Sequence, residues 1–239
     1  MQPASILVTM TPRRLVTLAT AVTLLLTLTA CGSDAPTREE ASQEAHSAAA
    51  RQASASSAEQ ISTLLSAVTQ ASPLRSVATS TRDTCHAGVT NALWPHDDYR
   101  LSCSLSDIRY FGADGDILDV VREVDKRAKA AGLIPTTTSA IEDVETYYAA
   151  NGKTDDGLLL PPPGLSYLVP AHDWTVQVRW TRDVNALINQ AVPDLTWPTV
   201  FVEADPVDFD ALRSGLLRRS EYLVTVSSGT TYYEVPWPS

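Results

Sequence analysis

The stretch YRLSCSLSDIRYFGADGDILDVVREVDKRAKAAGLIP, residues 99–135, decides the fold because two different hydrophobic periods meet in it. In its first part apolar and polar side chains alternate, which predicts a half-buried strand. The apolar positions of this strand are Tyr99, Leu101, Cys103 and Leu105. Residues 113–116, Ala-Asp-Gly-Asp, then predict a turn.

After the turn the period changes to that of a helix. Apolar residues recur on one helical face, at Ile117, Val121, Val124, Ala128 and Ala131. Gly132 and Pro135 follow, and both are typical of a helix end. A second helix is predicted to begin near Ser57, because Ser57 to Gln60 has capping-box spacing and an apolar stripe follows. Ser72-Pro73 ends that helix.

Weaker signals continue toward the C-terminus. Strands are predicted at residues 174–180 and around Val200 and Val202, with helices at 141–148, 184–191 and 209–216. A long loop is expected over 151–164. The end of the chain has the pattern of a hairpin, with strands 222–226 and 230–235 around a Ser-Ser-Gly turn. The sequence therefore predicts an α+β domain with a largely antiparallel sheet and packed helices.

The first thirty residues have a different character. Arg13 and Arg14 precede an uncharged apolar run, Leu15 to Leu28, which is the length of a signal-peptide core and short for a membrane-spanning helix. The run ends in Leu28-Thr29-Ala30-Cys31. Two alternatives remain open for export, the general secretory route and the twin-arginine route, and two for the start of translation, Met1 and Met10.

The tetrapeptide ending at Cys31 resembles the lipobox of bacterial lipoproteins, and the chain resembles exported lipoproteins of high-GC Gram-positive bacteria. The resemblance covers residues 1–33. It implies cleavage before Cys31, a diacylglyceryl group on its thiol with fatty acids such as palmitate, and anchoring at the outer face of the cell membrane. The expected organisation is a signal peptide at 1–30, a lipidated N-terminus and disordered tether at 31–56, and a single α+β domain at 57–239. The tether is expected because residues 32–57 have almost no large apolar side chain.

Charge and cysteine content limit the functions further. The formal charge is −10, from 18 basic and 28 acidic residues, which opposes nucleic-acid binding. Removal of Arg13 and Arg14 with the signal peptide would make it −12. With Cys31 assigned to lipid, Cys85 and Cys103 remain, and an even number in an oxidising compartment predicts one disulfide bond.

The sequence offers no strong catalytic motif. Gly164 to Leu168 lacks the second Gly of a hydrolase nucleophile turn, and Gly152-Lys153-Thr154 has Tyr147 where a phosphate-binding loop requires Gly. His96 and His172 stand beside aspartates but lack the helical spacing of metal ligands, and Asp114-Gly115-Asp116 fits a turn better than a calcium loop. No cofactor, metal site or catalytic residue is predicted. Two hypotheses stay open: glycoside hydrolysis by paired carboxylates, and stacking of sugars on tryptophans, of which Trp94 and Trp237 are the best candidates.

Three functions are consistent with these observations. The first is a non-enzymatic module that binds an envelope protein or a small ligand. The second is an envelope hydrolase whose site is assembled from residues distant in sequence, and the third is a structural accessory subunit. The absence of local motifs favours the first and third. A deep pocket that gathers a histidine or two carboxylates would favour the hydrolase, and a flat apolar patch would favour a protein partner.

Overall fold

The structure is a computed structural model that describes residues 35–70, 72–89, 97–151, 164–170, 172–182, 194–216 and 219–238. Residues 36–239 form one compact unit, separate from residues 1–35. The unit is α+β, with an antiparallel sheet as expected.

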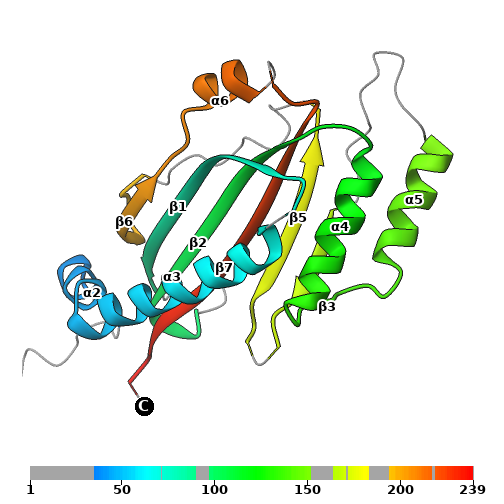
Figure 1. Ribbon diagram of the computed structural model, residues 1–239. Coiled ribbons are helices and arrows are strands. Elements are labelled where there is room, and N and C mark those ends of the chain that lie inside the picture. Colours follow the sequence, from blue (N-terminus) through cyan, green and yellow to red (C-terminus); the bar gives the residue numbers. More distant parts are fainter. Residues whose placement is uncertain are drawn as a thin grey trace, which may run out of the picture. The chain divides into compact units, whose positions relative to one another are not determined.

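Seven strands of the described chain form one sheet, in the order β3-β4-β5-β7-β2-β1-β6, and every neighbouring pair is antiparallel (Figure 1). Their bounds are β1 Arg75–Ala87, β2 Tyr99–Ala113, β3 Ile134–Pro135, β4 Leu165–Leu168, β5 Thr175–Thr181, β6 Thr199–Asp205 and β7 Tyr222–Pro236. The two longest strands, β2 and β7, pair side by side in the middle and are the backbone of the sheet.

Helices cover one face of this sheet. The helix α3 (Ala48–Thr69) lies across it, beside α4 (Ile117–Ala130), and α5 (Ala140–Asn151) packs against α4 (Figure 1). Ile61, Leu65 and Val68 of α3 are fully buried against apolar side chains of α4, β2, β5 and β7. A short helix, α6 (Phe209–Leu216), inserts Leu212 between Tyr110 and Leu223. These two residues alternate with the core residues Phe111 and Val224, so α6 covers the opposite face.

Much of the predicted element order is confirmed. The strand from Tyr99, the turn at residues 113–116 and the helix that follows it are present, and the strand continues to Ala113. Gly115 and Gly132 have φ values of +87° and +84°, a conformation that glycine adopts without steric cost. The strands near 174–180 and 200–202 and the helices near 141–148 and 209–216 are also found. The predicted helix at 184–191 lies outside the described residues, as does residue range 152–163 of the predicted loop.

The prediction of a disordered tether up to residue 56 is wrong for the part of it that the structure describes. Residues 38–45 form the helix α2 (Arg38–Ala45), and α3 begins at Ala48, so Ser57 lies inside a helix and is buried. Thr37 caps α2 in a capping box with Glu40, and Ser47 caps α3 by accepting a hydrogen bond from the amide of Ala50. The compact unit that begins at Pro36 therefore includes both of these helices.

The C-terminal hairpin is the second wrong prediction. Residues 222–236 form one continuous strand, and the expected turn residues Ser227, Ser228 and Gly229 pair with β2 on one side and β5 on the other. A Cβ atom on Gly229 would lie 3.0 Å from the carbonyl oxygen of Leu105, so this glycine permits close strand approach instead of a turn.

Candidate functional site

A cleft of about 760 Å³ lies between α3 and the helix-covered face of β1 and β2. The helix α3 forms its roof, with Ser54, Ala58 and Ser62. The strands form its floor through alternate residues, which are Thr79, Thr81 and Asp83 of β1 and Leu105, Asp107 and Arg109 of β2. Glu203 of β6 lines the cleft from the outer strand.

Strand register places the acidic residues of the cleft on one face. Asp83 lies opposite Leu105 on β2 and opposite Glu203 on β6, whereas Thr81 lies opposite Asp107. Asp83 and Asp107 are therefore diagonal neighbours, a relation that separates residues on adjacent strands by roughly 7–8 Å. Two carboxylates from distant parts of the sequence thus meet in one cleft.

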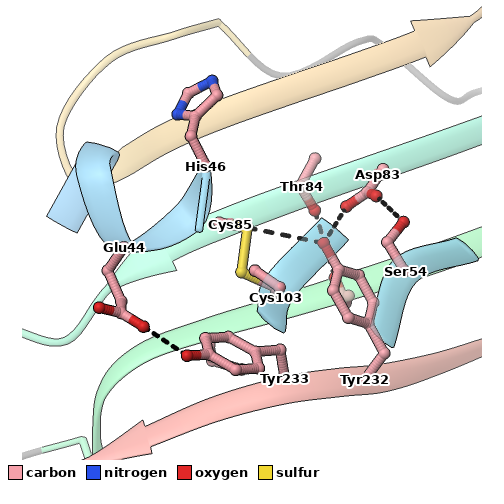
Figure 2. The surroundings of a disulfide bond; sticks show 12 residues. Glu44, His46, Ser54, Asp83, Thr84, Cys85, Cys103, Tyr232 and Tyr233 are labelled. Carbon is pink, nitrogen blue, oxygen red and sulfur yellow. Dashed lines mark hydrogen bonds between the residues drawn. A yellow bond between two sulfur atoms is a disulfide. The ribbon is translucent and has the colours of Figure 1, made fainter. Parts of the chain in front are cut away.

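Asp83 is nearly buried and accepts two hydrogen bonds from neutral hydroxyl groups. The hydroxyl of Ser54 donates to its Oδ2 over 2.5 Å, and the phenol of Tyr232 on β7 donates to its Oδ1 over 2.7 Å (Figure 2). Burial raises the pKa of the Tyr232 phenol, and the neighbouring Asp83 carboxylate raises it further. Tyr232 therefore remains a proton donor, and this cluster joins α3, β1 and β7 at one end of the cleft.

Asp107 is the least satisfied acid in the described structure. It is 7% exposed, and its Oδ1 has no hydrogen-bond partner among the described residues. Its Oδ2 accepts only a long hydrogen bond of 3.4 Å from Arg109. Burial raises the pKa of the Asp107 carboxyl, and the Arg109 guanidinium opposes that rise without overcoming it.

Arg109 connects the floor of the cleft to its roof. Its guanidinium donates to the hydroxyls of Ser62 and Ser66, each over 2.9 Å, and to the carbonyl oxygen of Ser62 over 3.0 Å. Most of its hydrogen-bonding capacity is therefore directed at α3, which leaves Asp107 only partly compensated.

The predicted disulfide bond is present. Cys85 and Cys103 lie directly opposite each other on β1 and β2 and are bonded. Ala41 and Ala45 of α2 pack over the bond in a small apolar cluster next to the cleft, and Figure 2 shows Tyr232 pointing toward Cys85. Glu44 of α2 accepts a hydrogen bond from the hydroxyl of Tyr233, which ties the same helix to β7.

None of the other described residues singled out in the sequence as site candidates lines this cleft. Cys31, Trp94, His96 and Lys153 lie outside the described residues. The ring of His172 stacks on Trp174, and the indole N–H of Trp237 donates to the carbonyl oxygen of Asp97. Ser166 lies within β4. Asp116 caps α4, as its turn predicts.

Asp83 and Asp107 were not among the site residues predicted from the sequence. Each is an acid at an inward-facing position of a strand, which is an unusual place for a charge. The signal for Asp107 was present, because it continues the alternation of Tyr99 to Leu105 by one step. Their proximity could not have been found, because it depends on the register between β1 and β2.

Within the described part of the chain, no helix is both long and apolar enough to cross a membrane. No three His, Cys, Asp or Glu residues of that part lie close enough together to hold a metal ion. Comparisons with known protein families, with curated proteins and with solved structures found no match.

Proposed function

We propose that this protein is an exported lipoprotein, anchored at the outer face of the cell membrane by a diacylglyceryl group on Cys31, whose folded unit binds a small ligand without transforming it. The observation that carries the binding function is the cleft between α3 and the sheet. Its volume of about 760 Å³ lies within the range of small-molecule sites, which is roughly 300–1,000 Å³.

The anchor is supported by the order of features in residues 13–31. An arginine pair, a short apolar run and the Leu-Thr-Ala-Cys box follow one another at the spacing of a lipoprotein signal. The acidic charge of the mature chain would repel anionic headgroups, so attachment requires a covalent or hydrophobic link.

The anchor depends on one sulfur atom, and this dependence can be tested directly. In cells fed radiolabelled palmitate, the wild-type protein should carry label, whereas Cys31→Ala should be unlabelled and either remain uncleaved or be released in soluble form. Cys85→Ala is the matched control and should keep the label. Label on the Cys31→Ala protein would refute the anchor.

The binding function can be tested by blocking the cleft. Detergent-solubilised mature protein is dialysed against a polar extract of the source envelope, and enriched compounds are identified by mass spectrometry. Ala58→Trp fills the roof of the cleft and should abolish enrichment, whereas Glu59→Trp, exposed on the same helix, should not. Enrichment that is equal in both variants, or absent in the wild type, would refute the proposal.

A hydrolase is the second candidate, because two carboxylates line one cleft, as acid–base hydrolysis requires. The hydrogen bonds of Asp83 weaken this candidate, since both of its oxygens already accept hydroxyl protons. Esterase, peptidase, glycosidase and phosphatase substrates should show no turnover. Turnover that Asp107→Asn or Asp83→Asn abolishes, and Glu142→Gln on α5 does not, would favour the hydrolase.

A further inference from the structure

We infer that the cleft takes a small organic cation that carries primary ammonium groups. The inference rests on the proposed binding function and adds the chemical class of the ligand. Its starting point is the charge of the lining: three carboxylates, Asp83, Asp107 and Glu203, face one guanidinium, that of Arg109.

The acidic charge is not neutralised within the described structure. Arg109 is the closest basic partner, and it is held by Ser62 and Ser66 of α3. Asp83 and Glu203 lie directly opposite each other, an arrangement that is destabilising for like charges. Among the described residues, the hydrogen bonds to Asp83 come from neutral hydroxyls. Arg109 forms its ion pair with Asp107, and neither Asp83 nor Glu203 has an ion-pair partner within that part of the chain.

Asp107 supplies the second, independent observation. A buried carboxylate oxygen without a partner costs free energy that a native structure ordinarily avoids. A buried polar group of this kind marks a candidate functional site. Because Asp107 lines the cleft, a donor with positive charge would offset both its missing hydrogen bond and its negative charge.

The spacing of these groups favours an organic cation over a metal ion. A calcium ion needs six to eight oxygens at about 2.3–2.6 Å, whereas the carboxylates here are spread over two cross-strand rows of the sheet. An aliphatic chain with an ammonium group at each end can reach both rows. Hydroxyls of Ser62, Thr79 and Thr81 lie along the cleft as further acceptors.

Three four-carbon probes of matched size test the inference: 1,4-diaminobutane, 1,4-butanediol and succinate, titrated calorimetrically into detergent-solubilised mature protein. The diamine should bind at least about tenfold more tightly than the diol, and succinate should not bind. Asp107→Asn should weaken the diamine about tenfold, because Asp107 is buried. Glu203→Gln should weaken it about threefold, because Glu203 is exposed. Glu142→Gln on α5 removes the same charge away from the cleft and should leave the affinity unchanged.

The results separate this inference from the function on which it rests. Equal affinity for diamine and diol, preference for succinate, or displacement of the diamine by calcium chloride with tighter calcium binding would overturn the organic cation. If the envelope extract then yields a neutral or anionic ligand that Ala58→Trp excludes, the binding function stands. If Ala58→Trp changes no binding at all, both proposals fail together.

Discussion

At the scale of single residues, Asp107 stands out because its burial is only partly compensated. The raised pKa of its carboxyl means that the folded protein holds this proton more tightly than the unfolded chain does. The free energy of unfolding should therefore fall as the pH rises from the ordinary aspartate value of about 3.9 through the raised folded value.

Asp107→Asn removes this cost while keeping the shape of the side chain. The variant should have a higher free energy of unfolding than the wild type at pH 7, and the difference should shrink toward zero below about pH 3, where the wild-type carboxyl is protonated in both states. Urea unfolding of both proteins at several pH values measures this difference, with Glu59→Gln as an exposed control. A less stable Asp107→Asn protein at pH 7 would show that the pairing with Arg109 outweighs burial.

At the scale of elements, the disulfide bond fixes the register of β1 against β2, on which the arrangement of the cleft depends. Loss of the bond by Cys85→Ala together with Cys103→Ala should lower the free energy of unfolding by about 2–4 kcal/mol. Thiol labelling of the native protein without reductant should fail at both cysteines. Stoichiometric labelling would contradict the bond.

The first turns of α3 are a second element with a clear test. Ala50 is 1% exposed, so Ala50→Glu would bury a charge without a partner and should cost about 2–4 kcal/mol of folding stability. Gln52→Glu adds the same charge at an exposed position of the same helix and should cost almost nothing. Thermal and urea unfolding distinguish these outcomes. Equal stability of the two variants would favour the prediction that this segment is a flexible tether.

The two wrong predictions have physical reasons that can be traced to particular residues. Residues 38–56 looked unable to bury surface because large apolar side chains are missing, yet Ala41, Ala45 and Ala50 bury well because their small size lets helices approach closely. Ser227 to Gly229 looked like a turn, but a central strand saturates its backbone on both sides, so turn-forming residues are tolerated there. Regular periods were predictable from sequence. Partners across the sheet were not, because register is a property of the whole fold.

At the scale of the molecule, the boundary at Pro36 predicts the product of limited proteolysis. Trypsin cleaves after arginine, and Arg51 lies within α3. The bond between residues 51 and 52 should therefore resist trypsin. Mass spectrometry of the digest should find residues 51–56 intact within the resistant fragment of the mature protein. Rapid cleavage after Arg51 with a stable remainder would place the start of the folded unit near residue 57.

The start of this compact unit at Pro36 also limits how far the unit can lie from the membrane surface in the proposed anchored form. Only five residues, 31–35, connect the lipidated sulfur to Pro36, and five extended residues span at most about 17 Å. This five-residue segment is therefore at most about two Debye lengths long at physiological ionic strength, where one Debye length is roughly 8 Å. A surface potential of about −30 mV concentrates a monovalent cation roughly threefold at an anionic bilayer. At two Debye lengths that potential has fallen to about one seventh, so headgroup composition would tune the occupancy of a cationic ligand only where this segment is much shorter than its extended length.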